Sequence, residues 1–378
     1  MCMDGLSILK GVEKMDKTIT YIVAILAVIS LVIASYGFIT FQDQITDLQG
    51  SISNLEGQLT SIDTIEGQLN VIQEQIEEYQ DTIEEQQQEI SEYQTVTLAD
   101  YLGNVVTLTS PPERIVSLAP SNTEMLFAVG AGDNVVGVTD FCNYPYNFAA
   151  WIEAGNMTSI GNYYGPSVEP IVALEPDLVL ASSGSLEAAE NLRNLGYNVL
   201  VLEARTIDAV LQDILVVGRA TGKDIEAGVL VSEIRTRIDT VSNQAAAATT
   251  TPKVYHEVWN EPIMSVGPGT FIEELMVLAG GENIFHDATT SWPVVSSEAI
   301  IEKNPDVMFF PDMYMGRANF YETIEAVKDR PGWNTITAVK NDALYEINAD
   351  IISRSGPRLV DALEAIAKMV HPEIFGQL

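Results

Sequence analysis

One short stretch of this chain occurs twice, and it decides the fold that the sequence predicts. Tyr163–Asp177 reads YYGPSVEPIVALEPD and Trp292–Asp306 reads WPVVSSEAIIEKNPD, and an apolar run follows each copy. The leading aromatic residue, the central glutamate and the final Pro-Asp pair recur at a constant separation of 129 residues. The sequence therefore predicts two lobes that are built on one plan.

Each copy is typical of a loop, a short helix and a strand. Ser167 and Ser297 are suited to cap helices whose first turns hold Glu169 and Glu298. A carboxylate is favoured there by the free N–H groups and by the helix dipole. The proline then ends the helix, because it lacks an N–H and restricts the residue before it. Either glutamate alone reads as a capping residue, but two matched copies favour a shared task.

Length and charge narrow the possible functions. The chain has 378 residues and is 47% apolar, which is ample for a sizeable core. Acidic residues outnumber basic ones by 53 to 19, so nucleic acid and anionic membrane surfaces are poor partners. The excess indicates a salty or extracellular setting, or a basic receptor. Cys2 and Cys142 flank an apolar run, which argues against a disulfide between them.

That apolar run predicts a membrane anchor near the amino end. Ile19–Phe41 carries no charge and follows three lysines. As a helix it extends about 35 Å, which is enough to cross a bilayer. The positive-inside rule then places residues 1–17 in the cytoplasm, residues 18–41 in the membrane and the rest outside. A cleaved signal peptide is the alternative, but the run is long for one and lacks a small-x-small cleavage site.

Residues 42–95 predict a helical coiled-coil stalk. The segment has no proline and no basic residue, and its apolar residues alternate at spacings of three and four, with one discontinuity between Ile62 and Ile65. A continuous helix of this length spans roughly 80 Å. A single solvated helix or a partly disordered spacer is the alternative, because thirteen acidic side chains would repel one another in a parallel bundle. A coiled coil would make the chain a homo-oligomer.

The rest of the chain predicts an α/β fold. Short apolar strands alternate with helical segments from residue 96 onward, which implies mostly parallel sheets covered on both faces. We expect an amino-terminal lobe over 96–205, a helical connector over 206–251 and a carboxy-terminal lobe over 252–378. The helix that begins near Lys223 and ends near Ala246 lies between the two lobes in sequence.

Five motifs, two of which are parts of the repeat, are spread over residues 114–358. They are Arg114–Glu124 (RIVSLAPSNTE), Ile171–Asp177 (IVALEPD), Gly280–Phe285 (GGENIF), Trp292–Ser296 (WPVVS) and Ser353–Arg358 (SRSGPR). With these motifs, residues 98–378 resemble the substrate-binding proteins of cobalamin and iron-siderophore ABC importers, and most closely the cobalamin-binding members. The resemblance implies two Rossmann-like lobes joined by one long helix, with the ligand in the cleft between them. It does not cover the anchor or the stalk.

The resemblance also implies roles for individual residues. By motif position, the implied ligand contacts are Phe141, Tyr163, Trp292 and the segment from Asp350 to Arg354, and the implied permease contacts are Glu169 and Glu298. The cobalamin binder of the family has tyrosine and tryptophan where this chain has Phe141 and Tyr163. A flat ring can still stack on these side chains, but the ligand stays open between a corrinoid, a ferric siderophore and haem.

Each of these candidate ligand residues also has a simpler structural role. Large aromatic residues are more often core residues, but a loop position before a proline or a helix start favours ligand contact for the three aromatics named above. Trp259, which ends a strand, is a weaker candidate. Arg354 precedes the last helix and is able to bind amide or phosphate oxygens. Its alternative role is a salt bridge to Asp350, and the two roles are compatible.

The sequence contains little that is typical of a catalytic or metal-binding site. The three histidines are far apart, no HExxH or CxxC pair occurs, and no glycine-rich phosphate loop follows a strand. We therefore expect no enzymatic activity, no metal and no cofactor. The sequence predicts an extracytoplasmic solute-binding protein that captures a corrinoid, cobalamin, and delivers it to an ABC permease. From a different class, a surface scaffold or sensor that oligomerises through its stalk is the alternative.

Overall fold

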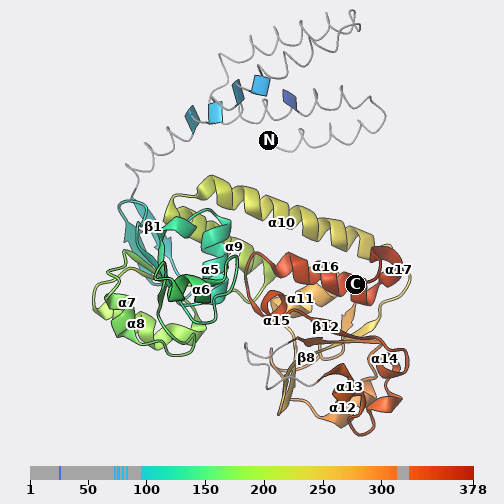
Figure 1. The fold of residues 1–378 in the computed structure, drawn as a ribbon. Coiled ribbons are helices and arrows are strands. Elements are labelled where there is room, and N and C mark those ends of the chain that lie inside the picture. The colour runs from blue at the N-terminus through green and yellow to red at the C-terminus, as the bar shows by residue number, and fades with distance from the viewer. Residues whose placement is uncertain are drawn as a thin grey trace, which may run out of the picture. The chain divides into compact units, whose positions relative to one another are not determined.

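The computed structural model describes residues 95–312 and 323–378, together with a few residues of the amino-terminal part (25–26, 72–73, 75–76, 79–80 and 82–83) (Figure 1). The chain divides into two compact units, Met1–Ile90 and Ser91–Leu378. The predicted anchor and nearly all of the predicted stalk lie outside the described residues. Among the residues that are described, no helix has the length and apolar character needed to cross a membrane.

The first lobe is a parallel five-stranded sheet with helices around it (Figure 1). Its strand order is β5-β4-β3-β6-β7, and the central strands β3 and β6 are wholly buried, as expected of strands covered on both faces. An antiparallel hairpin, β1 and β2, precedes it. The elements are β1 (Val96–Ala99), β2 (Val105–Leu108), β3 (Ile115–Ser117), α5 (Pro120–Ala128), β4 (Val135–Val138), α6 (Phe148–Glu153), β5 (Thr158–Ser159), α7 (Val168–Val172), β6 (Leu178–Ala181), α8 (Leu186–Asn194) and β7 (Val199–Val201).

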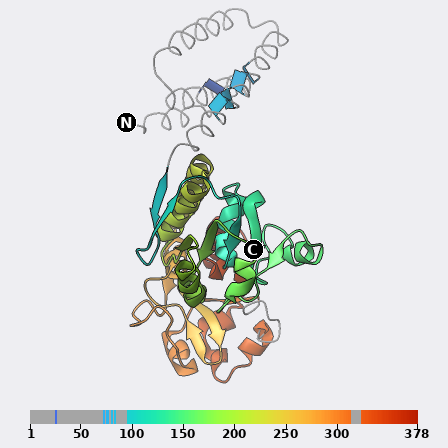
Figure 2. The ribbon, with the colours of Figure 1, turned by 90° about the vertical axis from the view of Figure 1, so that its left-hand side faces the viewer.

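Two long helices lead from the first lobe to the second. α9 (Ile207–Thr221) and α10 (Asp224–Ala245) pack against each other (Figure 1, Figure 2). Gly222 closes α9 in the left-handed conformation, with φ 70°, which a glycine adopts without steric cost. α10 covers the range expected for the connecting helix and also packs on α11 and α16 of the second lobe.

The second lobe follows the same plan. Its sheet has the order β10-β8-β11-β12, all parallel, and β9 pairs with β8 in the antiparallel sense. The elements are β8 (Lys253–Asn260), β9 (Ile263–Ser265), α11 (Phe271–Leu278), β10 (Glu282–Asn283), α12 (Ser297–Lys303), β11 (Val307–Pro311), α13 (Ile324–Lys328), α14 (Thr337–Lys340), β12 (Leu344–Ile347), α15 (Ala349–Ser353), α16 (Leu359–Val370) and α17 (Pro372–Phe375). The predicted two-lobe α/β fold is confirmed.

The hydrophobic core is continuous across the helices. One buried cluster contains side chains of β3 in the first lobe, of α9 and α10, and of α11 and α16 in the second lobe. A smaller cluster fills the other face of each sheet. Because apolar side chains of both lobes share one packed cluster, the lobes are joined by a core as well as by the chain.

The two copies of the repeat share a short helix and a left-handed turn, but Ser167 stands at the N-cap of α7 without a side-chain capping hydrogen bond, whereas the second helix has one. α7 and α12 begin after Ser167 and Ser296, which lie at equivalent positions of the two copies. The residues before the two prolines, Glu175 and Asn304, both have a left-handed backbone, with φ of 47° and 48°. The prediction that Ser297 caps the second helix was wrong. The hydroxyl of Ser296 accepts the capping hydrogen bond, and Ser297 is the first helical residue.

The aspartate that ends each copy fixes the start of a strand. The N–H of Asp177 donates to the carbonyl of Arg114 at 2.9 Å, and its carboxylate accepts the N–H groups of Arg114 and Glu113, the latter at 2.7 Å. In the second lobe, the N–H of Asp306 donates to the carbonyl of Lys253 at 2.8 Å, and its carboxylate accepts the N–H of Lys253 at 2.9 Å. The repeat thus sets where β3 and β8 enter their sheets.

Replacing this aspartate should destabilise the fold. Asp177→Ala leaves the N–H groups at the start of β3 without their acceptor, so we expect the free energy of unfolding to fall by about 1–2 kcal/mol. Urea unfolding measures the change. Glu233→Ala is the control, because Glu233 is exposed on α10 and has no ion pair within the described residues; its effect should stay within about 0.5 kcal/mol. Equal losses in both variants would contradict the assigned role.

His256 is a buried residue of β8. Its ring stacks on Phe309 with centroids 4.4 Å apart, and Nδ1 lies 3.1 Å from the carbonyl oxygen of Phe309. Burial lowers the pKa of His256 from 6.5 to about 4, against the opposing effect of the hydrogen bond to Phe309. The ring is therefore neutral in the folded state, and Nδ1–H donates to the carbonyl.

This burial makes stability depend on pH. As the pH falls from 6.5 toward about 4, the unfolded chain binds a proton at His256 that the folded chain does not, so stability is lost within that window. The contribution approaches about 1.4 kcal/mol per pH unit. Urea unfolding near pH 7.5 and near pH 5 should show a steeper loss for the natural chain than for His256→Gln. The same slope in both proteins would refute the assignment.

Candidate ligand-binding site

A carboxylate of the first lobe is bound by two arginines of the second lobe. Glu124, on α5, has a side chain that is only 2% exposed. Its Oε1 lies 2.8 Å from Nη1 of Arg354 and 2.6 Å from Nη2 of Arg358, and Oε2 accepts from Nε of Arg358 at 2.9 Å. Arg354 directly follows α15, and Arg358 directly precedes α16. We call these three residues the interlobe clamp.

Arg354 extends the clamp to the loop after β4. Its Nη1 also donates to Oδ1 of Asn143 at 2.8 Å, and Nη2 donates to the carbonyl of Phe141 at 3.1 Å. Nη2 lies 2.6 Å from Oδ1 of Asp350, so the predicted salt bridge is present. Asn143 in turn donates to Oδ2 of Asp350 at 2.7 Å. Both terminal nitrogens of Arg354 are therefore used by protein atoms from the two lobes.

Sequence reasoning gave no role to Glu124, Asn143 or Arg358. Glu124 and Arg358 lie inside motifs quoted above. Glu124 lies six residues before Gly130, as Glu274 lies six residues before Gly280, and this repetition is the sequence signal for Glu124. No motif in the sequence includes Asn143. A further aromatic residue, Tyr144, lies beside the clamp: the guanidinium of Arg358 is 4.0 Å from the centroid of its ring, and Tyr144 is 44% exposed.

The predicted ligand residues lie beyond the carboxyl ends of strands. Phe141 follows β4, Tyr163 follows β5 and Asp350 follows β12, while Trp259 is the next-to-last residue of β8. In each lobe these strands run parallel, so their carboxyl ends share one edge of the sheet. Ligands of open α/β sheets bind outside this edge, which is the location that the predicted residues occupy.

Tyr163 is held by its surroundings. Its ring meets that of Tyr164 edge to face, with centroids 4.6 Å apart. A Cβ on Gly184 would lie 2.8 Å from the Tyr163 ring, so only glycine leaves room for the ring in this place. Tyr163 is half-buried and Tyr164 is 55% exposed. The two rings form a polarisable surface in the loop after β5.

The two tryptophans differ in how they are held. Trp292 is 44% exposed in the loop before α12, and the following residues are tied to β9 by a bridge between Val294 and Met264. Trp259 donates its indole N–H to the carbonyl of Glu261 at 2.8 Å. The structure thus joins Arg354 to Asp350 and to the backbone carbonyl of Phe141, and it places Tyr163 and Trp259 near the carboxyl ends of β5 and β8.

Glu169 and Glu298 are exposed at equivalent positions of α7 and α12. Each is the second residue of its helix, within the first turn that the sequence predicted. The pKa of the Glu298 carboxyl is lowered, first by its own backbone N–H and then by the Ser296 hydroxyl. Glu298 is therefore ionised at neutral pH. The exposed position leaves both side chains available to a partner.

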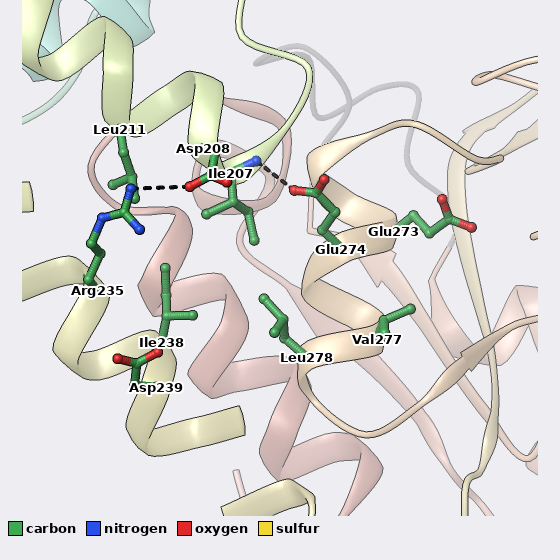
Figure 3. A pocket seen from close by; sticks show the side chains of 10 residues that line it. All are labelled: Ile207, Asp208, Leu211, Arg235, Ile238, Asp239, Glu273, Glu274, Val277 and Leu278. Carbon is green, nitrogen blue, oxygen red and sulfur yellow. Dashed lines mark hydrogen bonds and ion pairs between the residues drawn. The ribbon is translucent and has the colours of Figure 1, made fainter. Parts of the chain in front are cut away.

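A second carboxylate joins the second lobe to the connecting helices. Glu274 on α11 accepts the N–H of Ile207, the first residue of α9, at 2.6 Å (Figure 3). Beside it lies a cavity of about 450 Å³ between α9, α10 and α11, where Arg235 pairs with Asp208 at 3.2 Å (Figure 3). None of the predicted ligand residues lines this cavity, so it is separate from the predicted cleft.

Within the described ranges, no three histidine, cysteine, aspartate or glutamate side chains converge to hold a metal ion. Cys142 is a free, buried thiol that contacts the hydroxyls of Thr123 and Thr139. Burial raises the pKa of this thiol, so it has little thiolate character at neutral pH.

Comparison with known proteins identifies the family. Residues 115–351 match the family model described as periplasmic binding protein. The uncharacterised ABC transporter substrate-binding lipoprotein YvrC of Bacillus subtilis is 33% identical over 288 residues, which cover 74% of this chain and 87% of that protein. A cobalamin-binding protein of Halobacterium salinarum is 31% identical over 282 residues, covering 73% and 74%.

Solved structures agree. The periplasmic heme-binding protein RhuT from Roseiflexus sp. RS-1, in apo form, superposes with a TM-score of 0.60 at 25% identity, covering 68% of this chain and 98% of that one. The resemblance inferred from the motifs is confirmed, and so is the expectation of a non-enzymatic protein, because the family binds solutes. The chain belongs to the periplasmic binding protein family, the extracytoplasmic substrate-binding proteins of ABC importers.

Proposed function

We propose that this protein captures a corrinoid, cobalamin, in the cleft between its lobes and delivers it to an ABC permease. The observation that carries the proposal is the pair of loop aromatics, Tyr163 and Trp292, which begin the two copies of the repeat and lie beyond the sheets of opposite lobes. Two such rings suit a large flat macrocycle, because offset stacking favours extended ring surfaces. The named cobalamin-binding relative supports the same ligand class.

The other predicted contacts complete this cleft in the proposal. Phe141 adds a third ring from the first lobe, and Asp350 adds a carboxylate from the second lobe. Trp259, whose indole N–H is used by a backbone carbonyl, contributes ring surface only. A haem or a ferric siderophore is the alternative ligand, which the similarity to a heme-binding structure favours.

The permease contact belongs to Glu169 and Glu298 in this proposal. Two exposed carboxylates, one on each lobe, are suited to arginine pockets on the permease, because guanidinium and carboxylate groups form paired hydrogen bonds. Residues 18–41 would anchor the chain and residues 42–95 would hold the binding unit away from the membrane. The lobes would then comprise 96–205 and 252–378, with 206–251 as the connector.

A ligand panel tests the proposed function. The full chain, purified in a mild detergent, should be stabilised by cobalamin in a thermal-shift assay, by about 2.7 kcal/mol at one hundred times the Kd. Trp292→Ala should bind about tenfold more weakly. Tyr101→Ala removes another exposed ring, from the β1–β2 loop, and should bind normally. Stabilisation by haem or a ferric siderophore alone would replace the corrinoid by the alternative ligand, and no response to any of them would refute the proposal.

A charge reversal tests the permease contact. Glu169→Arg combined with Glu298→Arg should abolish cobalamin uptake by cells, because like charges would face the arginine pockets. Calorimetry should show an affinity for cobalamin within about twofold of the natural chain. Glu187→Arg with Glu325→Arg is the matched control, because these glutamates also lie exposed in the first turns of helices of the two lobes. Loss of affinity in the first variant would place these residues at the cleft instead.

A further inference from the structure

The interlobe clamp connects the packed helices to the residues of the cleft. Glu124 lies on α5, which packs against β3, and Arg358 directly precedes α16. A carboxylate this buried is costly unless it is paired and hydrogen-bonded. Two guanidinium groups satisfy both of its oxygens, so the position of Glu124 dictates where Arg354 must lie.

Arg354 also fixes the positions of two residues near the predicted cleft. The same guanidinium holds Oδ1 of Asn143 from the first lobe and Oδ1 of Asp350 from the second. Asn143 and Asp350 are joined directly, at 2.7 Å, across the lobe boundary. Asp350 is 23% exposed and Asn143 is exposed, so both side chains are accessible to solvent while their Oδ1 atoms accept hydrogen bonds from Arg354.

The remaining hydrogen-bonding capacity of this pair defines what it is able to bind. One N–H of Asn143 donates to Asp350, which leaves its second N–H, and the Asp350 carboxylate keeps lone pairs beyond those used by Arg354 and Asn143. The free acceptors are anionic. An uncharged N–H donor such as a primary amide fits them, whereas a carboxylate in the same place would be repelled.

Glu274 occupies the equivalent position in the second lobe but has different hydrogen-bond partners. Its carboxylate accepts the backbone N–H of Ile207, which lies in the connector and not in the first lobe. No arginine joins it to a residue at the carboxyl ends of the strands within the described chain. The two glutamates thus share a place in the fold, and only Glu124 is linked to the predicted ligand residues.

We propose that Glu124 is a positioning residue for ligand binding: through Arg354 it holds Asn143 and Asp350 together as a polar pair, in which Asp350 accepts an N–H of a primary amide of the ligand and the second N–H of Asn143 donates to the amide oxygen. This inference rests on the proposed function, because the corrin ring carries primary amide side chains. It predicts that the clamp contributes selectivity between amide and carboxylate forms of the ligand, in addition to any contribution to stability.

The test compares cobalamin with its monocarboxylate derivatives, in which one amide is replaced by a carboxylate. Calorimetry on the full chain in detergent should show that the natural protein prefers at least one amide form by about tenfold. Glu124→Gln should bind cobalamin about tenfold more weakly and lose this preference. Glu274→Gln is the matched control; it should lower the melting temperature while affinity and preference stay unchanged.

A second variant covers the case in which Glu124→Gln does not fold. Asn143→Ala changes an exposed side chain and should show the same loss of preference, and the double variant should lose less than the sum of the single losses, because both act through one network. Unchanged preference in Glu124→Gln or in Asn143→Ala would overturn the inference alone. Failure of the natural chain to bind any corrinoid would overturn the proposed function and the inference with it.

Discussion

The rest of this structure depends on one buried charge. Glu124 is almost fully removed from water, and two arginines of the other lobe compensate it. Removing a carboxylate from water costs several kcal/mol unless such partners are in place. The lobes are therefore able to meet only where Arg354 and Arg358 reach Glu124, and this meeting point brings the loops after β4 and β12 together. The common hydrophobic cluster of α9, α10, α11 and α16 supports the same arrangement from the helical side.

The duplicated stretch separates structural from functional positions. Asp177 and Asp306 bind the backbone at the start of β3 and β8, so their role is to build the lobes. The glutamates of the two copies make no such strand contact and stay exposed on short helices. The leading aromatics, Tyr163 and Trp292, lie in loops at the ligand edge. One repeated sequence thus supplies a structural anchor, an exposed charge and a ring in each lobe.

Much of this was accessible from the sequence, because it depends on local rules. Apolar runs predicted the strands, and Pro-Asp predicted the end of α7 and α12. The cap of α12 was misplaced by one residue because Ser296 and Ser297 are adjacent and chemically alike. The clamp was out of reach, because the contacts of Arg354 with Glu124 and Asn143 join residues 230 and 211 positions apart. A local sequence pattern does not predict which charged residues, far apart in the chain, will form a buried ion pair.

A crystal structure of the full chain with cobalamin tests the central claim most directly, namely that the cleft between the lobes holds a corrinoid. The account predicts the corrin ring between Tyr163 and Trp292, an amide side chain within hydrogen-bond distance of Asp350 or Asn143, and an intact contact between Glu124 and Arg354. Cobalamin bound elsewhere, for example in the cavity between α9, α10 and α11, would contradict it. So would a complex in which the ring lies in the cleft but Glu124 has left Arg354.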